Sequence, residues 1–299
     1  MADDEPMHVT GRLHIGSIDA ARNLDALQRL RVGGALALLG KGEEDAAVYR
    51  HSSAVSEGYA DLGITRTTVE IEDSEDGDLL RRLPEILTAL RKLMYDENEW
   101  SRGIAGRSRS ASVLAAWMLI NESKQQGVQD VVDRIRIVRP WIEINPYFMR
   151  DLHLFHTVLT LTDGPLDAEN ASLLEERTFP RLNFGANLVG GILKGTKTIT
   201  MRLVSDVKGD RNSDLGDIFP HSIVAAATAS SDGSLTRRQF AYLRIDQIET
   251  QELSTIAQTT LMKSGFSSTH EVLTVLKQYY PNVTATTPLL MLHFQCLHF

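Results

Sequence analysis

The sequence predicts two domains, an α/β domain followed by an α+β domain. The chain has 299 residues, which is enough for about two domains. Apolar segments of strand and helix length alternate in the first half, whereas short strand-like segments and turns dominate from Phe179 onward. A polar segment with Gly164 and Pro165 lies between these halves. We therefore expect a flexible N-terminus over residues 1–10, a first domain over 11–162, a linker over 163–178 and a second domain over 179–299.

The first domain contains two apolar segments that predict its core. The segment from Leu27 to Leu39 predicts a helix that leads into an apolar strand over residues 33–39. Residues 111–120 read ASVLAAWMLI, and this apolar run predicts a largely buried helix.

A short polar segment, residues 102–110, comes immediately before the predicted buried helix and reads RGIAGRSRS. Small residues allow the backbone to curl tightly, so that its N–H groups point inward around an anion. The N-terminus of the helix adds the positive end of its dipole, and Arg109 offers two donors to phosphate oxygens. The alternative is a polar turn that caps a core helix, with Arg107 and Arg109 solvated.

Residues 11–160 resemble the dual-specificity phosphatase family. The resemblance extends through the whole first domain, and the order and spacing of its segments agree with that family. It implies a central, mostly parallel sheet flanked by helices. The segments that carry it are Arg12–Ser17, Leu27–Leu39, Val69–Leu80, Arg102–Ser110, Val138–Pro140 and Ile144–Leu152.

The same resemblance implies a role for individual positions of the loop. Gly103 stands where the family has its nucleophilic cysteine, and a glycine cannot form a phosphoenzyme intermediate. Arg109 matches the arginine that grips the phosphoryl oxygens, and Ser110 matches the hydroxyl that stabilises the thiolate. We therefore expect a pseudophosphatase whose loop binds a phosphoprotein or a small anion. The expected anion-binding residues are Gly103, Ile104, Ala105, Gly106, Arg107, Ser108, Arg109 and Ser110.

Asp73 stands where the family has its general acid. The alternative is an ordinary turn or helix-capping residue in an acidic loop. The approach to the loop also departs from the family. Arg102 replaces a histidine, and Glu97 and Glu99 stand where a buried parallel strand is normally apolar. We therefore expect this strand to be frayed, displaced or shifted in register.

The second domain is predicted to consist of short strands interrupted by two helices. The helices are expected near residues 251–263 and 268–279, and Pro281 follows the second of them. Segment 171–178 is a further candidate for a short connecting helix. The expected strands are Thr198–Val204, Ser222–Ala229, Phe240–Ile248 and Leu289–Leu297.

The segment Gly195–Arg202 carries the most informative pattern of the second domain. Its alternation places Thr198, Thr200 and Arg202 on one face of a strand. With Leu188–Leu193, Leu215–Asp217, Ser264–Ser268 and Leu290–Leu297, it resembles the ASCH domain, a small β-barrel related to the PUA fold. That resemblance implies recognition of RNA or of a modified nucleoside, with Gly195, Lys197, Thr200 and Arg202 as the binding residues.

Similar small bacterial ASCH proteins deacetylate N4-acetylcytidine with a lysine, a threonine and a glutamate. The resemblance maps the first two onto Lys197 and Thr200 as possible catalytic residues. The glutamate position holds Ser264, and Glu271 is a candidate substitute further along the chain. The alternative for Lys197 and Arg202 is a solvated strand edge that discourages aggregation.

Composition limits the possible partners. The chain carries 39 acidic and 31 basic residues, a net charge of −8, so no global basic field favours unspecific binding of nucleic acid. One cysteine excludes an internal disulfide, and no zinc-ligand pattern is present, so we expect no cofactor or metal. With no signal sequence or long apolar segment, a cytoplasmic location without membrane contact is expected. A local basic group is expected from Lys194, Lys197, Arg202, Lys208 and Arg211.

Three functions fit these observations. We expect first an inactive phosphatase-like binding module joined to an ASCH domain that recognises RNA or a nucleoside. The second is an ASCH-type amidohydrolase acting on N4-acetylcytidine-like nucleosides, beside a non-catalytic phosphatase-like domain. The third is an RNA-binding protein in which the phosphatase fold serves only as a scaffold.

Overall fold

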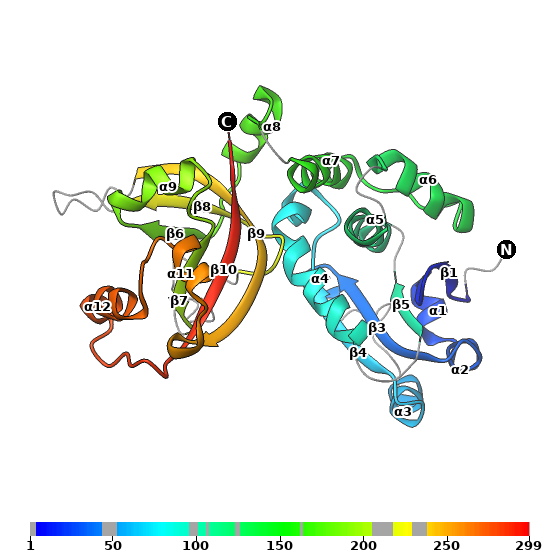
Figure 1. Cartoon of the computed structure of the whole chain (residues 1–299). Coiled ribbons are helices and arrows are strands. Elements are labelled where there is room, and N and C mark those ends of the chain that lie inside the picture. The colour runs from blue at the N-terminus through cyan, green and yellow to red at the C-terminus, as the bar shows by residue number, and fades with distance from the viewer. Residues whose placement is uncertain are drawn as a thin grey trace. The chain divides into compact units, whose positions relative to one another are not determined.

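Two units, Met1–Thr160 and Leu161–Phe299, make up the chain (Figure 1). The computed structural model describes residues 4–43, 53–95, 101–105, 108–122, 126–161, 164–204, 218–228 and 238–298.

The first unit is built on a five-stranded sheet with the strand order β1-β2-β5-β3-β4. Strand β1 pairs with β2 in the antiparallel sense, and the other neighbours are parallel. Parallel neighbours require crossover connections, which the helices of this unit supply. The strands are β1 Met7–Thr10, β2 Leu13–Gly16, β3 Val32–Leu39, β4 Thr65–Glu70 and β5 Ser101–Ala105.

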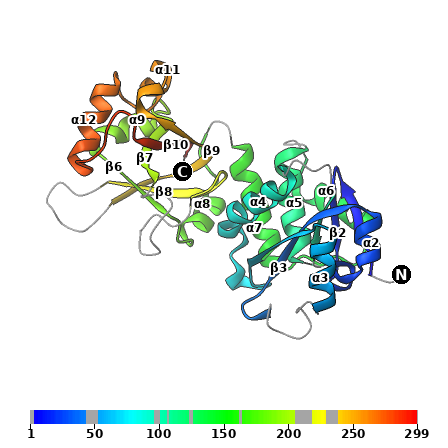
Figure 2. The ribbon, with the colours of Figure 1, turned by 90° about the horizontal axis from the view of Figure 1, so that it is seen from below.

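Helices lie on both faces of this sheet. Figures 1 and 2 show α4, α5, α6 and α7 together on one side, with α1, α2 and α3 on the other. The centre of the larger group is α5, which is apolar along almost its whole length and buried, as the sequence predicts. The helices are α1 Ile18–Arg22, α2 Leu24–Arg29, α3 Ser53–Asp61, α4 Leu79–Tyr95, α5 Arg109–Asn121, α6 Val128–Val138 and α7 Pro146–Thr160.

Two features of the first unit differ from the expectation. Residues 1–10 are not a flexible end throughout, because Met7–Thr10 forms edge strand β1 and Glu5 pairs with Arg29. The strand before the loop holds the central place of the sheet despite its polar approach: β5 pairs with β2 on one side and with β3 on the other. Residues 96–100, which carry the acidic approach, lie outside the described residues.

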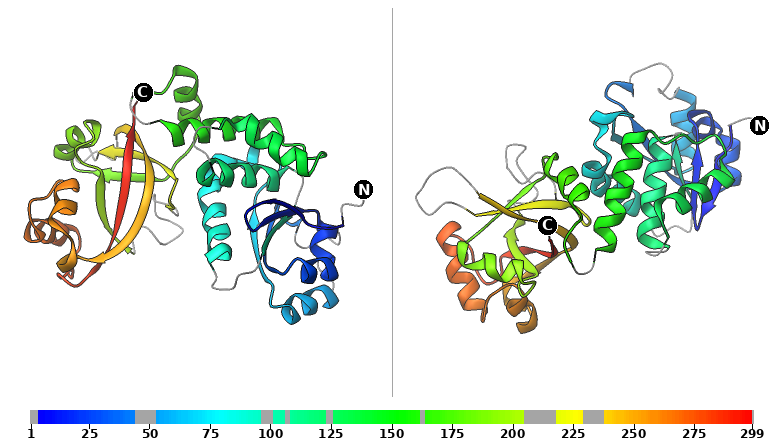
Figure 3. Two further views of the ribbon diagram at one scale, coloured as in Figure 1. Left: turned by 45° about the vertical axis from the view of Figure 1, so that its right-hand side comes forward. Right: turned by 90° about the horizontal axis from the view of Figure 1, so that it is seen from above.

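The second unit is built on a curled, mixed, five-stranded sheet with the order β6-β8-β9-β10-β7. Strands β6 and β8 are parallel, and the remaining pairs are antiparallel. Figure 3 shows the strong curvature of the two long strands, β9 and β10. The strands are β6 Arg181–Phe184, β7 Ile199–Leu203, β8 Ile223–Thr228, β9 Arg238–Glu252 and β10 Pro288–Leu297.

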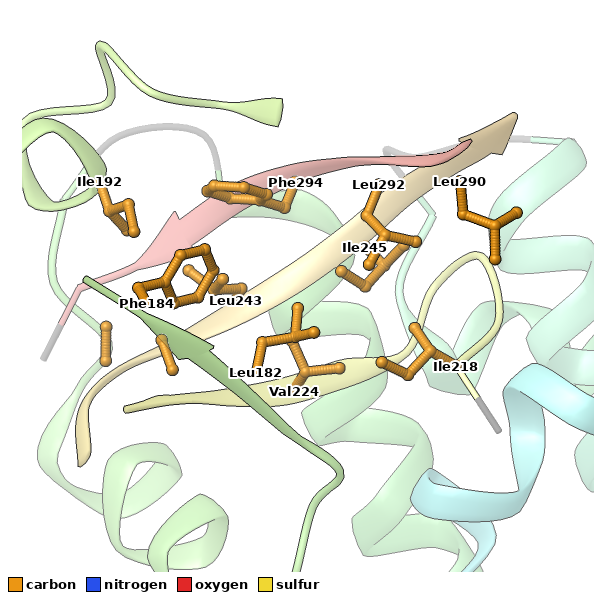
Figure 4. Packing of buried hydrophobic residues seen from close by; sticks show 12 residues of the cluster. Leu182, Phe184, Ile192, Ile218, Val224, Leu243, Ile245, Leu290, Leu292 and Phe294 are labelled. Carbon is orange, nitrogen blue, oxygen red and sulfur yellow. The ribbon is translucent and has the colours of Figure 1, made fainter. Parts of the chain in front are cut away.

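The curl of this sheet encloses an apolar core. Figure 4 shows side chains of β6, β8, β9 and β10 converging, among them Phe184, Leu243 and Phe294. A second apolar cluster packs the other side of β7 and β10 against two helices, with Ile199, Met291 and Leu261 in it. The helices of this unit are α8 Ala168–Glu175, α9 Val189–Leu193, α11 Gln258–Lys263 and α12 Thr269–Tyr279.

The predicted boundaries of the second domain need three changes. Segment 163–178 is not a free linker, because α8 lies in the second unit and buries Leu174 there. The helix expected near 251–263 begins only at Gln258, after β9 has continued to Glu252. The sequence pattern also missed β6.

Within the described ranges, no helix is long and apolar enough to cross a bilayer.

Candidate functional site

Arg109 is the first residue of α5 and lies beside two other segments of the first unit. One guanidinium nitrogen, Nη1, donates to Oε2 of Glu43 at 2.7 Å and to the carbonyl oxygen of Ile71 at 3.2 Å. The Arg109 side chain is only 12% exposed and that of Glu43 is 31% exposed. The arginine that the sequence assigns to an anion therefore already holds an anionic side chain.

Glu43 is held from two directions. Its Oε2 also accepts from the backbone N–H of Gly40 at 2.7 Å, across the turn after β3. Burial raises the pKa of Glu43, but the bonds from Arg109 and Gly40 outweigh it and leave the pKa below its ordinary value. The carboxylate is thus kept ionised beside the guanidinium.

Asp73, the predicted general acid, lies next to the start of α5. Its Oδ1 accepts from the Ser108 hydroxyl at 2.7 Å and from the Asn145 amide at 2.6 Å. The Asn145 N–H donates to the Ser108 hydroxyl oxygen at 3.2 Å, and Asn145 Oδ1 accepts from the Phe148 N–H at the start of α7. This network ties the acidic loop to the starts of α5 and α7.

The backbone before Arg109 differs from the predicted loop. Gly103, Ile104 and Ala105 belong to β5 and pair with β2 and β3, so they do not curl into a nest. Gly106 and Arg107 lie outside the described residues. Only residues 106–108 separate β5 from α5, and Ser110, the second residue of α5, is fully buried.

Lys197 is the most unusual residue of the second unit, because its long cationic side chain is buried. Its Nζ donates to the carbonyl oxygens of Ile199, at 2.8 Å, and Ser264, and it lies over the ring of Phe266. Burial, together with the charge of Arg202, lowers the pKa of Lys197 to about 7. A buried, partly neutral amine is suited to base or nucleophile chemistry.

The other residues predicted for this site have different surroundings. The register of β7 places Thr200 opposite Leu292 and Arg202 opposite Leu290, both on the face of the enclosed core. Arg202 donates to the Asn183 carbonyl at 2.6 Å and lies over the ring of Phe184. It therefore links edge strand β7 to edge strand β6 and is not a solvated strand end.

Lys197 and Thr200 are not joined by a hydrogen bond between their side chains in the described structure. Gly195 serves the turn before β7, where its φ of +68° favours glycine. Of the expected basic group, Lys194 is exposed, whereas Lys208 and Arg211 lie outside the described residues.

Glu271 does not substitute for the carboxylate that Ser264 lacks. Its Oε2 accepts from the N–H and the hydroxyl of Ser267, so it caps the start of α12. The Ser264 hydroxyl donates to the Leu261 carbonyl at 2.7 Å. Neither side chain hydrogen-bonds the Lys197 amine in the described structure.

Sequence reasoning missed Glu43 and Asn145. Glu43 lies 66 positions from Arg109 in a turn whose sequence resembles any charged surface turn. Asn145 offered a weak signal, since an asparagine before Pro146 fits a helix start. Neither pattern indicates the partner that the side chain finds.

Solved structures of dual-specificity phosphatases are similar to about half of this chain. Human DUSP28 is 21% identical, covers 52% of this chain and 95% of its own, and gives a TM-score of 0.42. A human tyrosine phosphatase-like serine/threonine/tyrosine-interacting protein is 16% identical over 53% of this chain and 99% of its own, with a TM-score of 0.44. The Yvh1 phosphatase domain from Chaetomium thermophilum is 20% identical over 53% and 99%, with a TM-score of 0.41.

These similarities concern the course of the backbone. No protein-family model matches the sequence, and no curated protein matches it.

Proposed function

We propose that the first unit is a non-catalytic, phosphatase-like module that binds a phosphate group or another anion. The observation that supports this proposal is the contact of Arg109 with Glu43 at 2.7 Å. A largely buried guanidinium at the start of a long helix already holds one carboxylate oxygen there. Charge-assisted bonds of this kind, with the helix dipole behind them, favour an oxyanion.

The absence of a thiol nucleophile is the reason to propose binding without turnover. Position 103 is a glycine within β5, and the chain has a single cysteine, Cys296, in β10 of the second unit. Burial raises the pKa of the Cys296 thiol to about 11, which disfavours the thiolate. In this proposal Asp73 does not act as an acid; it connects the starts of α5 and α7 through its hydrogen bonds to Ser108 and Asn145.

The test is a titration of the full chain with phenyl phosphate, compared with the variant Arg109→Ala. We expect the variant to bind at least about tenfold more weakly, because a charge-assisted hydrogen bond is lost. Calorimetry measures the affinity at constant ionic strength. The matched control is Arg134→Ala, since Arg134 is an ion-paired arginine of α6 in the same unit.

Unchanged affinity in Arg109→Ala would contradict the anion site. Release of phosphate from phenyl phosphate by the wild-type chain would contradict the non-catalytic role, whatever the affinity.

For the second unit we propose recognition of RNA or a modified nucleoside, on the resemblance carried by Gly195–Arg202. The buried amine of Lys197 favours one specific alternative, an amidohydrolase that acts on N4-acetylcytidine-like nucleosides. With a pKa of about 7, a substantial fraction of this amine is neutral near neutral pH and able to take up a proton or attack a carbonyl.

Deacetylation of N4-acetylcytidine by the full chain, followed by absorbance, separates the two alternatives. If the unit is an amidohydrolase, we expect the activity to fall by at least about a hundredfold in Lys197→Ala, since removing a proton-transfer group costs that much. Lys194→Ala is the control, because Lys194 is exposed three positions earlier. Deacetylation that survives in Lys197→Ala would exclude a mechanism that uses this lysine. If the wild-type chain does not deacetylate N4-acetylcytidine, the proposal for this unit is recognition without catalysis.

A further inference from the structure

The acidic turn after β3 closes over the arginine of the proposed anion site. Glu43 reaches Arg109 from this turn, and its own N–H donates to the Gly40 carbonyl at 3.0 Å. From the other side, Glu72 Oε1 accepts from the Lys41 N–H at 2.6 Å. The neighbouring Ile71 carbonyl also accepts from Arg109. Two segments that are distant in sequence therefore meet around one guanidinium.

Gly40 is the point on which both carboxylates converge. A Cβ atom there would lie 2.6 Å from Glu72 Oε2 and 3.2 Å from the carboxyl carbon of Glu43, so a side chain would press on both. The Gly40 N–H bonds to Glu43, and the following N–H bonds to Glu72. The backbone of this turn thus fixes the Glu43 carboxylate against Arg109 independently of the ion pair.

We infer that Glu43 is a built-in competitor of the anion that Arg109 binds, so that an external phosphate must displace this carboxylate to enter. The inference rests on the proposed function of the first unit. Glu43 and the Ile71 carbonyl already occupy the Nη1 donor, and two negative groups on one largely buried guanidinium repel each other. The site in the described structure is therefore closed by the chain's own side chain, and movement of the turn after β3 opens it.

Neutralising Glu43 tests this inference. The full chain and its variant Glu43→Gln are titrated calorimetrically with inorganic phosphate at constant ionic strength. We expect Glu43→Gln to bind phosphate about tenfold more tightly, because a competing, partly exposed ion pair is removed. The matched control is Glu85→Gln, which removes the same charge from a partly exposed carboxylate that pairs with Arg82 in α4 of the same unit, and we expect a change below about threefold.

Gly40→Ala provides a second variant that leaves the net charge unchanged. Gly40 has no positive φ, so alanine fits the backbone and pushes the two carboxylates aside. We expect tighter phosphate binding here as well. This result is independent of whether Glu43→Gln folds well.

The outcomes separate the inference from the proposed function. Equal affinity in the wild type and Glu43→Gln, with binding lost in Arg109→Ala, overturns the competitor role and leaves the anion site in place. Equal tightening in Glu43→Gln and Glu85→Gln also overturns it, because a general charge effect then explains the change. No binding in the wild type, Glu43→Gln or Gly40→Ala overturns both ideas.

Discussion

Replacing Lys197 with methionine is expected to remove a large pH dependence from the stability of the second unit. The pKa of Lys197 is about 7 in the folded chain against 10.5 for an ordinary lysine, because the side chain is buried and Arg202 adds like charge. Below pH 7 the lysine is protonated in both the folded and unfolded states, and the folded state bears the cost of a buried charge. Above pH 7 the unfolded state binds more protons, so stability rises with pH until about 10.5.

This linkage gives the size of the effect. Between about pH 6 and about pH 9, the free energy of unfolding of the wild type should rise by roughly 3 kcal/mol relative to Lys197→Met. Urea unfolding followed by far-UV circular dichroism measures it at each pH. Lys194→Met, the exposed neighbour, serves as the control. Parallel pH profiles for wild type and Lys197→Met would show that the amine is not buried as described.

The tryptophans allow the two units to be followed separately in such experiments. All three, Trp100, Trp117 and Trp141, belong to the first unit, so tryptophan fluorescence reports its unfolding. A transition seen by circular dichroism and absent from fluorescence then belongs to the second unit.

Replacing Gly77 with alanine is expected to destabilise the first unit by roughly 3 kcal/mol, in the upper range for overpacking. Gly77 is buried in the 3-10 turn Glu75–Gly77. A Cβ atom there would lie 2.1 Å from the Glu72 carbonyl oxygen and 2.9 Å from a ring carbon of Phe148. The Glu72 oxygen belongs to the backbone and the Phe148 ring is fully buried, so neither can move aside without a large cost in free energy.

The consequence reaches the candidate anion site, because the backbone that must move leads into Asp73, whose carboxylate holds Ser108 at the start of α5. We therefore expect Gly77→Ala to weaken phosphate binding as well as stability, the latter measured by tryptophan fluorescence in urea. The control is Gly127→Ala, where a Cβ atom meets only Asp130 Oδ2 at 3.5 Å. Similar losses in both variants would mean that the space around Gly77 is not restrictive.

Local patterns in the sequence predicted many of the elements. The buried helix after the loop, the strands over 223–228 and 288–297, and the helix over 269–279 follow from apolar periodicity and from capping and breaking residues. These signals lie within each segment, so they can be interpreted without knowledge of the fold.

Elements whose identity depends on distant partners were missed or misplaced. Strand β6 has four residues and gains its structure from pairing with β8. Strand β5 begins with two polar residues, Ser101 and Arg102, and it occupies the centre of the sheet because β2 and β3 satisfy its backbone on both sides. For such short segments, the hydrogen bonds of neighbouring strands outweigh intrinsic preference.

The sequence by itself determined which charged residues this protein has at its two candidate sites, Arg109 and Lys197. Only the tertiary structure decided what surrounds them. Glu43 lies 66 positions from Arg109, and Ser264 lies 67 positions from Lys197. Because both side chains are largely buried, these remote neighbours decide how each charge is compensated. The carboxylate of Glu43 pairs with the Arg109 guanidinium. The Lys197 amine has two carbonyl oxygens and no counter-ion among its hydrogen-bond partners. No local pattern encodes such a pairing, since it arises only when the folded chain brings the segments together.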